Sequence, residues 1–256
     1  MARHNIRDRH ILITGASTGL GRAMALECAA RGARVGLIAR RQKHLEDLRD
    51  ELQTLGIQAA YAAVDVVDTE AMNQAVQTLE EALGPVYGLI ANAGIAGNTK
   101  RGLLKIEYAN RCIDVNVKGV INSIGAVQAG MLERNEGFLS VVSSLAAYRG
   151  LPTSGPYSAS KAAVSTLMES LRVDLIRTGL SLTTIHPGFV KTPLTDAVNH
   201  PKPFMISAEK AAKIMINGLI KGKREINYPF RLSFLMSVVR RLPNFLYDFI
   251  LSKTVR

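Results

Sequence analysis

The fold is decided by the stretch His10-Ile11-Leu12-Ile13-Thr14-Gly15-Ala16-Ser17-Thr18-Gly19-Leu20-Gly21. It begins with an apolar run that predicts a buried strand and passes into a segment of helical period from Gly19 to Arg31. Gly15 permits a tight turn, Gly19 lets the backbone approach a phosphate closely, and Gly21 lets the helix pack against the strand. The free N–H groups and positive dipole end of that helix favour a pyrophosphate. The spacing differs from the common dinucleotide fingerprint, but its place after the first strand predicts a dinucleotide site, with a plain glycine turn as the alternative.

The rest of the chain alternates apolar runs with longer segments of helical period. Further strands are expected at 33–39, 57–64, 86–91, 138–143, 181–186 and 225–228. Further helices are expected at 42–55, 69–83, 108–133, 156–178 and 207–221, and Pro243 divides 230–251 into two short ones. Repeated strand–helix units predict a doubly wound α/β fold, with a mostly parallel sheet and helices on both faces. Because no repeat or linker divides residues 1–256, we expect one domain.

Composition narrows the class of protein. The chain has 256 residues, of which 47% are hydrophobic, and this length suits one large α/β domain. Cys28 and Cys112 are too few for a disulfide framework or a structural zinc site, so we expect a cytoplasmic protein without a metal. The N-terminal residues lack the apolar core of a signal peptide, and no apolar run approaches the roughly 18 residues of a membrane span.

Two arginines follow the second expected strand. In sheets that bind NAD, an acidic residue near this point accepts hydrogen bonds from the ribose 2′-OH. Here Ala39 is followed by Arg40 and Arg41. A guanidinium can hold a 2′-phosphate through paired, charge-assisted hydrogen bonds, whereas a carboxylate would repel it. We therefore predict NADP as the cofactor, with Arg40 as the first candidate and Arg41 as the second; the alternative is that both lie on an exposed loop.

Tyr157 and Lys161 are four residues apart at the start of an expected helix, so their side chains share one face. A free phenol has a pKa near ~10, and a nearby ammonium lowers it. Such a pair suits proton transfer to or from an alcohol oxygen while a hydride moves to or from nicotinamide. Surface helices also carry this spacing, so the pair indicates chemistry only together with its surroundings.

Other polar residues follow neighbouring strands. Ser144 follows the fifth strand, and its hydroxyl can polarise a carbonyl. Asn92 and Gly94 follow the fourth strand. Asn116 lies in the middle of an expected helix, where asparagine is disfavoured and a buried amide requires partners. Because open α/β sheets bind ligands at the carboxyl ends of their strands, we expect this edge to carry the site.

Together these motifs resemble the classical short-chain dehydrogenase/reductase family. The matching elements, in the family's order and spacing over roughly residues 8–195, are Thr14–Gly21, Asp65-Val66, Asn92-Ala93-Gly94, Asn116, Ser144, Tyr157 with Lys161, and Pro187-Gly188 with Thr192. The resemblance implies a Rossmann-type sheet of about seven strands, and homodimers or homotetramers. One departure is Ala91, where many members have another asparagine, and we expect little consequence from it.

The resemblance also implies roles for individual residues. Tyr157 is the expected general acid/base, Lys161 lowers its pKa and binds the nicotinamide ribose, Ser144 positions the substrate oxygen, and Asn116 supports a water-mediated proton relay. The expected cofactor contacts are Gly15, Ser17, Thr18, Gly19, Leu20, Gly21, Arg40, Arg41, Asp65, Val66, Asn92, Gly94, Tyr157, Lys161, Pro187, Gly188, Val190 and Thr192. The Ala39-Arg40 pattern is similar to that of the family's NADP-preferring members.

Two segments bear on the substrate. Residues 188–206 are expected to form a substrate lid, with an ordered loop that has no gating role as the alternative. Residues 230–256 are apolar and basic, and residues 201–256 hold 11 basic and 3 acidic residues. For this C-terminal segment, packing in the core or a subunit interface, a cover over an apolar substrate pocket and contact with a membrane surface all stay open.

We therefore expect an NADP-dependent oxidoreductase that transfers a hydride between NADP(H) and a carbonyl or secondary alcohol, with an apolar substrate favoured by the apolar residues of the C-terminal segment. The alternatives are a non-catalytic NADPH-binding regulator and a membrane-surface adaptor that uses residues 230–256. An epimerase or dehydratase of the wider family is disfavoured, because those chains are usually longer. No nucleic-acid partner is expected, since the basic residues are not interleaved with stacking aromatic residues.

Overall fold

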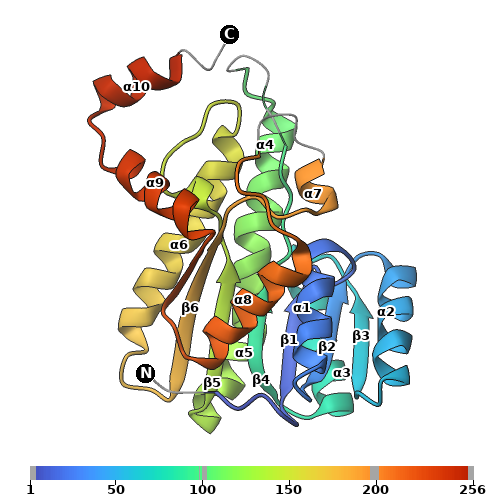
Figure 1. Cartoon of the computed structure of the whole chain (residues 1–256). Helices are drawn as coiled ribbons and strands as arrows, with labels where there is room; N and C mark the ends of the chain where they lie inside the picture. The colour runs from blue at the N-terminus through green and yellow to red at the C-terminus, as the bar shows by residue number, and fades with distance from the viewer. Residues whose placement is uncertain (1–3, 98, 100–102, 197–201, 253–256) are drawn as a thin grey trace.

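Seven parallel strands form one sheet in the computed structural model of the chain (Figure 1), which describes residues 4–97, 99, 103–196 and 202–252. The strands lie in the order β3-β2-β1-β4-β5-β6-β7. Their bounds are β1 His10–Thr14, β2 Arg34–Ala39, β3 Ala59–Ala63, β4 Val86–Ala91, β5 Gly137–Val142, β6 Leu180–Pro187 and β7 Glu225–Tyr228. Every neighbouring pair is parallel, which confirms the predicted doubly wound, Rossmann-type fold.

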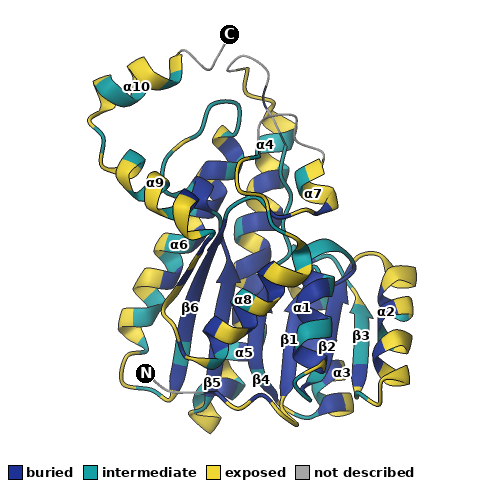
Figure 2. Ribbon diagram, in the orientation of Figure 1, coloured by how far each residue is buried: buried dark blue, intermediate teal, exposed yellow. Residues whose placement is uncertain are grey.

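Helices cover both faces of the sheet. Their bounds are α1 Gly19–Ala29, α2 Gln42–Thr54, α3 Thr69–Leu83, α4 Ile106–Ile113, α5 Gly119–Arg134, α6 Gly155–Asp174, α7 Pro193–Asp196, α8 Ala208–Ile220, α9 Phe230–Arg240 and α10 Asn244–Ser252. Helices α1, α2 and α8 bury one apolar cluster against the sheet, and α3, α5 and α6 bury a second on the opposite face. The inner strands β1, β2, β4, β5 and β6 are mostly dark blue in Figure 2, because helices cover both of their faces, whereas the edge strand β3 is only half-buried.

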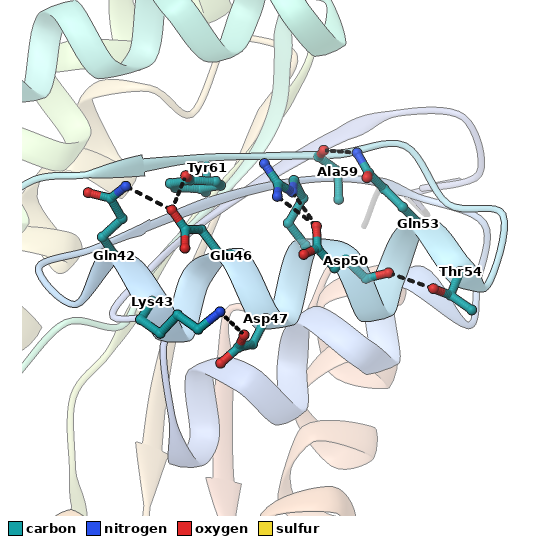
Figure 3. A network of polar contacts seen from close by, with 10 residues as sticks. Gln42, Lys43, Glu46, Asp47, Asp50, Gln53, Thr54, Ala59 and Tyr61 are labelled. Atoms are coloured by element: carbon teal, nitrogen blue, oxygen red, sulfur yellow. Dashed lines mark hydrogen bonds and ion pairs between the residues drawn. The ribbon is translucent and has the colours of Figure 1, made fainter.

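Helix α2 shows how the sequence pattern becomes packing. Leu45, Leu48 and Leu52 recur at helical spacing and are all buried against the sheet. On its exposed side, the carboxylate of Glu46 accepts hydrogen bonds from Gln42 (2.8 Å) and from the Tyr61 hydroxyl of β3 (2.9 Å) (Figure 3). These contacts tie the first turns of α2 to the sheet and so fix the end of the loop between β2 and α2.

The long helix that the sequence predicts at 108–133 is interrupted. A π-helical turn, η1 (Asp114–Lys118), separates α4 from α5, and Asn116 lies within it. A single extra residue in a helical turn is a local bulge that often marks a functional position. The other predicted elements are found within a few residues of their expected ends, although α6 ends at Asp174 rather than 178 and β3 covers only 59–63 of the expected 57–64.

His10 is a buried polar residue in β1. Its Nδ1 donates to the Gly84 carbonyl oxygen (2.8 Å), and its Nε2 has no hydrogen-bond partner among the described residues. Burial lowers the pKa of His10 to about 4, because a charged imidazole would lose its hydration there. The folded protein therefore holds His10 in its neutral form.

We expect His10 to make the stability fall with acid. The unfolded chain binds this proton near pH 6.5 and the folded chain only near 4, so the contribution is intact above pH 6.5 and is lost as the pH falls. The loss amounts to about 3 kcal/mol by pH 4. Urea unfolding between pH 4 and 7 measures it. His10→Gln should flatten this pH dependence, while His44→Gln at an exposed position should not; equal slopes in both variants would contradict the assignment.

Candidate active site

A cavity of about 590 Å³ opens where the strands end at their carboxyl edge. It lies at the point where the strand order reverses between β1 and β4, which is where open α/β sheets bind ligands. The predicted site residues that line it are Gly15, Ser17, Thr18, Gly19, Leu20, Gly21, Arg40, Arg41, Asp65, Val66, Asn92, Gly94, Ser144, Tyr157, Lys161, Pro187, Gly188, Val190 and Thr192. Asn116 is the one predicted site residue that is not in this lining.

The turn between β1 and α1 is closely packed at two of its glycines, where a side chain would have no room. Gly15 has φ +66°, a conformation that favours glycine, and a Cβ there would lie 2.8 Å from the Cα of Ala93. A Cβ on Gly21 would overlap the carbonyl oxygen of Gly15. At the start of α1, Thr18 makes no side-chain capping bond and the first turn holds no acidic residue. The helix therefore presents free N–H groups and its positive dipole end at the cavity, which suits a phosphate group.

Asn92 joins this turn to the end of β4. Its backbone N–H donates to the Thr14 hydroxyl (3.1 Å), and its side-chain amide donates to the carbonyl oxygens of Thr14 (3.0 Å) and Gly15 (3.3 Å). The backbone N–H of Ala93 donates to the same Thr14 hydroxyl (3.1 Å). Two strands that are distant in sequence are thereby fixed at the floor of the cavity.

Arg40 and Arg41 both line the cavity, but their guanidinium groups contact different partners. Arg41 donates to the hydroxyls of Ser17 (2.9 Å) and Thr18 (2.7 Å), so its guanidinium lies against the glycine-rich turn. Arg40 is 61% exposed along its side chain, and its guanidinium is 3.8 Å from the carboxylate of Asp65. The sequence ranked Arg40 first, yet Arg41 is the one that contacts the turn directly.

Asp65 is held by a residue that the sequence analysis missed. Arg111 of α4 donates to its carboxylate (2.7 Å), and the backbone N–H of Val67 also donates to it (3.3 Å). Partial burial alone would raise the pKa of Asp65, but these hydrogen bonds and the charges of Arg111 and Arg40 lower it overall. Nothing in the spacing of Arg111 indicates this contact, because 46 residues separate it from Asp65 in the sequence.

Ser144, Tyr157 and Lys161 meet deeper in the cavity. Lys161 is almost fully buried, and its amine donates to the Val142 carbonyl oxygen (2.7 Å) while lying 5.8 Å from the centre of the Tyr157 ring. Burial lowers the pKa of Lys161 to about 8. Burial also raises the pKa of Tyr157, against the effect of its hydrogen bond with Ser144. This differs from the expected lowering by Lys161, because the amine is turned to Val142 in this geometry.

Asn116 lies behind the cavity with its amide fully bonded. Its Oδ1 accepts from the backbone N–H of Ile95 (2.8 Å), and its Nδ2 donates to the Ile95 carbonyl (3.0 Å) and the Ser160 hydroxyl (2.9 Å). A Cβ at Gly94 would lie 3.2 Å from Asn116 Oδ1 and 3.4 Å from Lys161 Nζ, so the two side chains border the same small space. Asn116 lies in the π-helical turn η1, and its amide points to Ile95, just after the end of β4.

Part of the cavity lining is apolar. It includes Leu145, Leu151, Phe189, Leu194, Leu232 and Met236, none of which the sequence analysis named as a site residue. Of the predicted lid 188–206, residues 197–201 lie outside the described residues. The ends of the lid are joined, since Lys191 donates to the Ile206 carbonyl (2.9 Å) and Ile206 to the Phe189 carbonyl (3.1 Å). A gating role for it stays a prediction.

Arg149 ties α9 to the loop that follows Ser144. Its guanidinium donates to the carbonyl oxygen of Leu242 (2.6 Å) and to the side chain of Asn244 (2.7 Å), and it also contacts the carbonyls of Val239 and Arg240. It lies 4.1 Å from the centre of the Tyr247 ring, whose hydroxyl donates to the Gly150 carbonyl. The end of α9 and the start of α10 are therefore attached to a wall of the cavity.

His186 packs beside the site rather than in it. Its ring nitrogens form hydrogen bonds with Ser165 (3.1 Å) and Asn227 (2.9 Å), and it is absent from the cavity lining.

Within the described residues there is no cluster of three or more metal-ligating side chains. Among the same residues, every helix is too short or too polar to pass through a lipid bilayer.

The sheet and its glycine-lined cavity define a Rossmann-type protein, and comparison with known proteins specifies the family. The sequence model of the family described as short chain dehydrogenase matches residues 9–203. A relative from Myxococcus xanthus, named an uncharacterized oxidoreductase, is 42% identical over 240 residues, which are 94% of this chain and 95% of the relative. The chain belongs to the short-chain dehydrogenase/reductase family and is an oxidoreductase of that family, as the sequence motifs indicated.

Solved structures agree on the fold. A short-chain dehydrogenase/reductase from Burkholderia phymatum, in complex with NAD, superposes with a TM-score of 0.86 at 22% identity, covering 97% of this chain and 96% of that one. An alcohol dehydrogenase from the archaeon Thermococcus sibiricus, complexed with 5-hydroxy-NADP, superposes with a TM-score of 0.78 at 26% identity over 86% and 95% of the two chains. The likeness extends over nearly the whole chain in the first case.

Arg149→Ala should loosen the C-terminal helices without unfolding the sheet. The variant loses several charge-assisted hydrogen bonds, so amide hydrogen exchange across residues 230–252 should become about tenfold faster or more. Mass spectrometry of the exchanged peptides measures this, with strands β1 and β4 as internal references. Arg49→Ala, which removes an exposed ion pair to Asp50 on α2, is the control. Unchanged exchange in α9 and α10 would show that Arg149 does not hold them.

Proposed function

We propose that the protein is an NADP-dependent oxidoreductase that transfers a hydride between NADP(H) and a carbonyl or secondary alcohol, with Tyr157 as the general acid/base. The observation that carries the proposal is the convergence of Ser144, Tyr157 and Lys161 in the same cavity as the glycine-rich turn. When it is bound, the nicotinamide supplies or accepts the hydride. The apolar side chains in the cavity lining favour apolar carbonyl substrates.

The protein's own residues handle the proton. The Tyr157 hydroxyl gives its proton to the forming alkoxide oxygen in reduction and takes it back in oxidation. Ser144, which already hydrogen-bonds Tyr157, orients the same oxygen and polarises the carbonyl. A lysine whose pKa lies near 8 exchanges protons readily near neutral pH, so Lys161 resupplies Tyr157 and Asn116 supports a water-mediated relay behind it.

A dinucleotide fits the residues that are present. The bare glycine-rich turn and the uncapped start of α1 suit the pyrophosphate. Asp65 and Val66 would border the adenine, and Asn92, Gly94 and Lys161 the nicotinamide ribose. The remaining contacts on the nicotinamide side would come from Pro187, Gly188, Val190 and Thr192.

The preference for NADP rests on Arg40 and Arg41. The second strand ends without a carboxylate, and the two arginines that follow it line the cavity, where their guanidinium groups could hold a 2′-phosphate. The solved relatives contain NAD in one case and 5-hydroxy-NADP in the other. The proposal that this protein prefers NADP therefore rests on its own two arginines.

A non-catalytic NADPH-binding regulator is the weaker candidate, because such a protein has no need of the set Asn116, Ser144, Tyr157 and Lys161. A homodimer or homotetramer and a cytoplasmic location stay predictions from the sequence.

The direct test of activity is to follow the NADPH absorbance while a panel of carbonyl compounds is added. If the protein turns over none of these compounds, the non-catalytic regulator is favoured.

Tyr157→Phe should abolish turnover while the cofactor still binds. Loss of a positioned acid/base costs about 10²–10⁴-fold in rate. We expect kcat to fall by this amount and the Kd for NADPH, measured by fluorescence titration, to change less than about threefold. Tyr148→Phe is the matched control, since it removes a hydroxyl outside the cavity. Undiminished turnover in Tyr157→Phe would end the proposal for its role.

Substitution of the two arginines should weaken NADPH binding selectively. Each guanidinium that contacts a 2′-phosphate contributes charge-assisted hydrogen bonds, so Arg40→Ala and Arg41→Ala should each raise the Kd for NADPH about tenfold to a hundredfold. The Kd for NADH should stay nearly unchanged. Wild-type protein that binds NADH as tightly as NADPH would contradict the choice of NADP.

A further inference from the structure

The last two helices, which we call the C-terminal arm (residues 230–252), expose large apolar side chains. Phe230 is 79% exposed, Phe234 62% and Phe245 75%. Helix α10 buries no residue at all, although most of its nine residues are apolar, and Leu232 is the one buried residue of α9. Packing within the described chain therefore does not explain why the arm is apolar.

Helix α9 packs on the body of the protein, whereas α10 stands away from it (Figure 1), and the outer surface of the arm is largely exposed (Figure 2). It keeps this position through Arg149 and Tyr247, which attach it to the loop beside Ser144. On α9, Leu232 and Met236 line the cavity, whereas Phe234 and Val238 are exposed. One helix thus forms a wall of the site and also an outward apolar surface.

Other exposed apolar residues lie at the same end of the molecule, where the strands end at their carboxyl edge. They precede or begin α4, or belong to the segment around α7, both at the top of Figure 1. These residues are Leu103, Leu104, Ile106, Leu194, Phe204 and Met205. The arm is therefore not alone in exposing apolar side chains at this end of the described molecule.

The charge of the arm is positive. Among residues 230–252, Arg231, Arg240 and Arg241 are exposed, and Asp248 is the only acidic residue. The whole chain carries a formal charge of +11. Exposed phenylalanines interleaved with arginines on short helices are the pattern of a segment that lies in the interface of an anionic bilayer.

We propose that the C-terminal arm docks on the surface of an anionic lipid bilayer, with its phenylalanines in the interface and its arginines at the headgroups. A second copy of this chain is the poorer occupant, because a symmetric contact through the arm would place the net positive charge of both arms in one interface. A bilayer supplies apolar and negatively charged groups at once.

Vesicle flotation tests the proposal with the full-length protein. Wild-type protein should float with vesicles of phosphatidylcholine and phosphatidylglycerol, and should float much less with phosphatidylcholine alone or in high salt. Phe234→Ser and Phe245→Ser should each lower the partition coefficient about tenfold. Leu55→Ser, which removes an apolar residue that is 65% exposed at the far end of α2, should leave it unchanged.

Three results would overturn the proposal. The first is wild-type protein that stays unbound to anionic vesicles. The second is flotation of the two phenylalanine variants at the wild-type level. The third is a wild-type oligomer that light scattering shows to dissociate in Phe234→Ser or Phe245→Ser, while neither the wild type nor the variant binds vesicles. That outcome would assign the arm to a contact with a second copy of the chain. Flotation requires neither cofactor nor substrate, so its failure is separate from a failure of the proposed activity.

Discussion

The candidate site depends on the close contact between the first turn of the chain and the end of β4. Asn92 bonds the backbone of Thr14 and Gly15, and Thr14 in return accepts from the backbone of residues 92 and 93. Only glycine leaves room for this contact at positions 15 and 21. Because the strand order reverses between β1 and β4, the contact closes the floor of a crevice that the crossover helices leave open. Helix α1 then starts at the crevice with its N–H groups free.

Buried polar groups fix the part of the same crevice that holds Tyr157 and Lys161. An amine or amide that leaves water must be hydrogen-bonded, and this requirement restricts where its helix can lie. Lys161 meets it through Val142 at the end of β5, and Asn116 meets it through Ile95 after β4 and Ser160 on α6. Two helices are thereby held to neighbouring strand ends by their polar side chains. The position of Tyr157, one turn before Lys161 on α6, follows from these bonds.

Local pattern was sufficient for the sheet and for most helices, and together with the family motifs it predicted about half of the residues that line the cavity. The inner strands are apolar because they are buried on both faces, and the motif residues at their ends reach one edge because parallel strands end at the same side of the sheet. What the sequence did not reveal depends on contacts between distant segments. Arg111 reaches Asp65 across 46 residues and Arg149 reaches Leu242 across 93, so neither has a spacing that a pattern could detect. The π-helical turn at Asn116 is similar: the asparagine was noticed, but its effect on the helix comes from bonds to Ile95 and Ser160.

Helix α9 lies between the cavity and the exposed apolar surface of the C-terminal arm. Its inner side chains, Leu232 and Met236, complete the apolar part of the cavity, so the helix must stay close to Gly188 and the strand ends. A helix with apolar residues on its other side as well is stable in water only if something covers that side. The glycine-rich turn and the Tyr157 cluster explain none of those outer residues. Arg149 fixes the end of α9 to the loop after Ser144. Whatever covers the arm is therefore separated from the cavity only by the width of α9. An interface that attracts the arm would thus bring the apolar opening of the site next to apolar molecules dissolved in that interface.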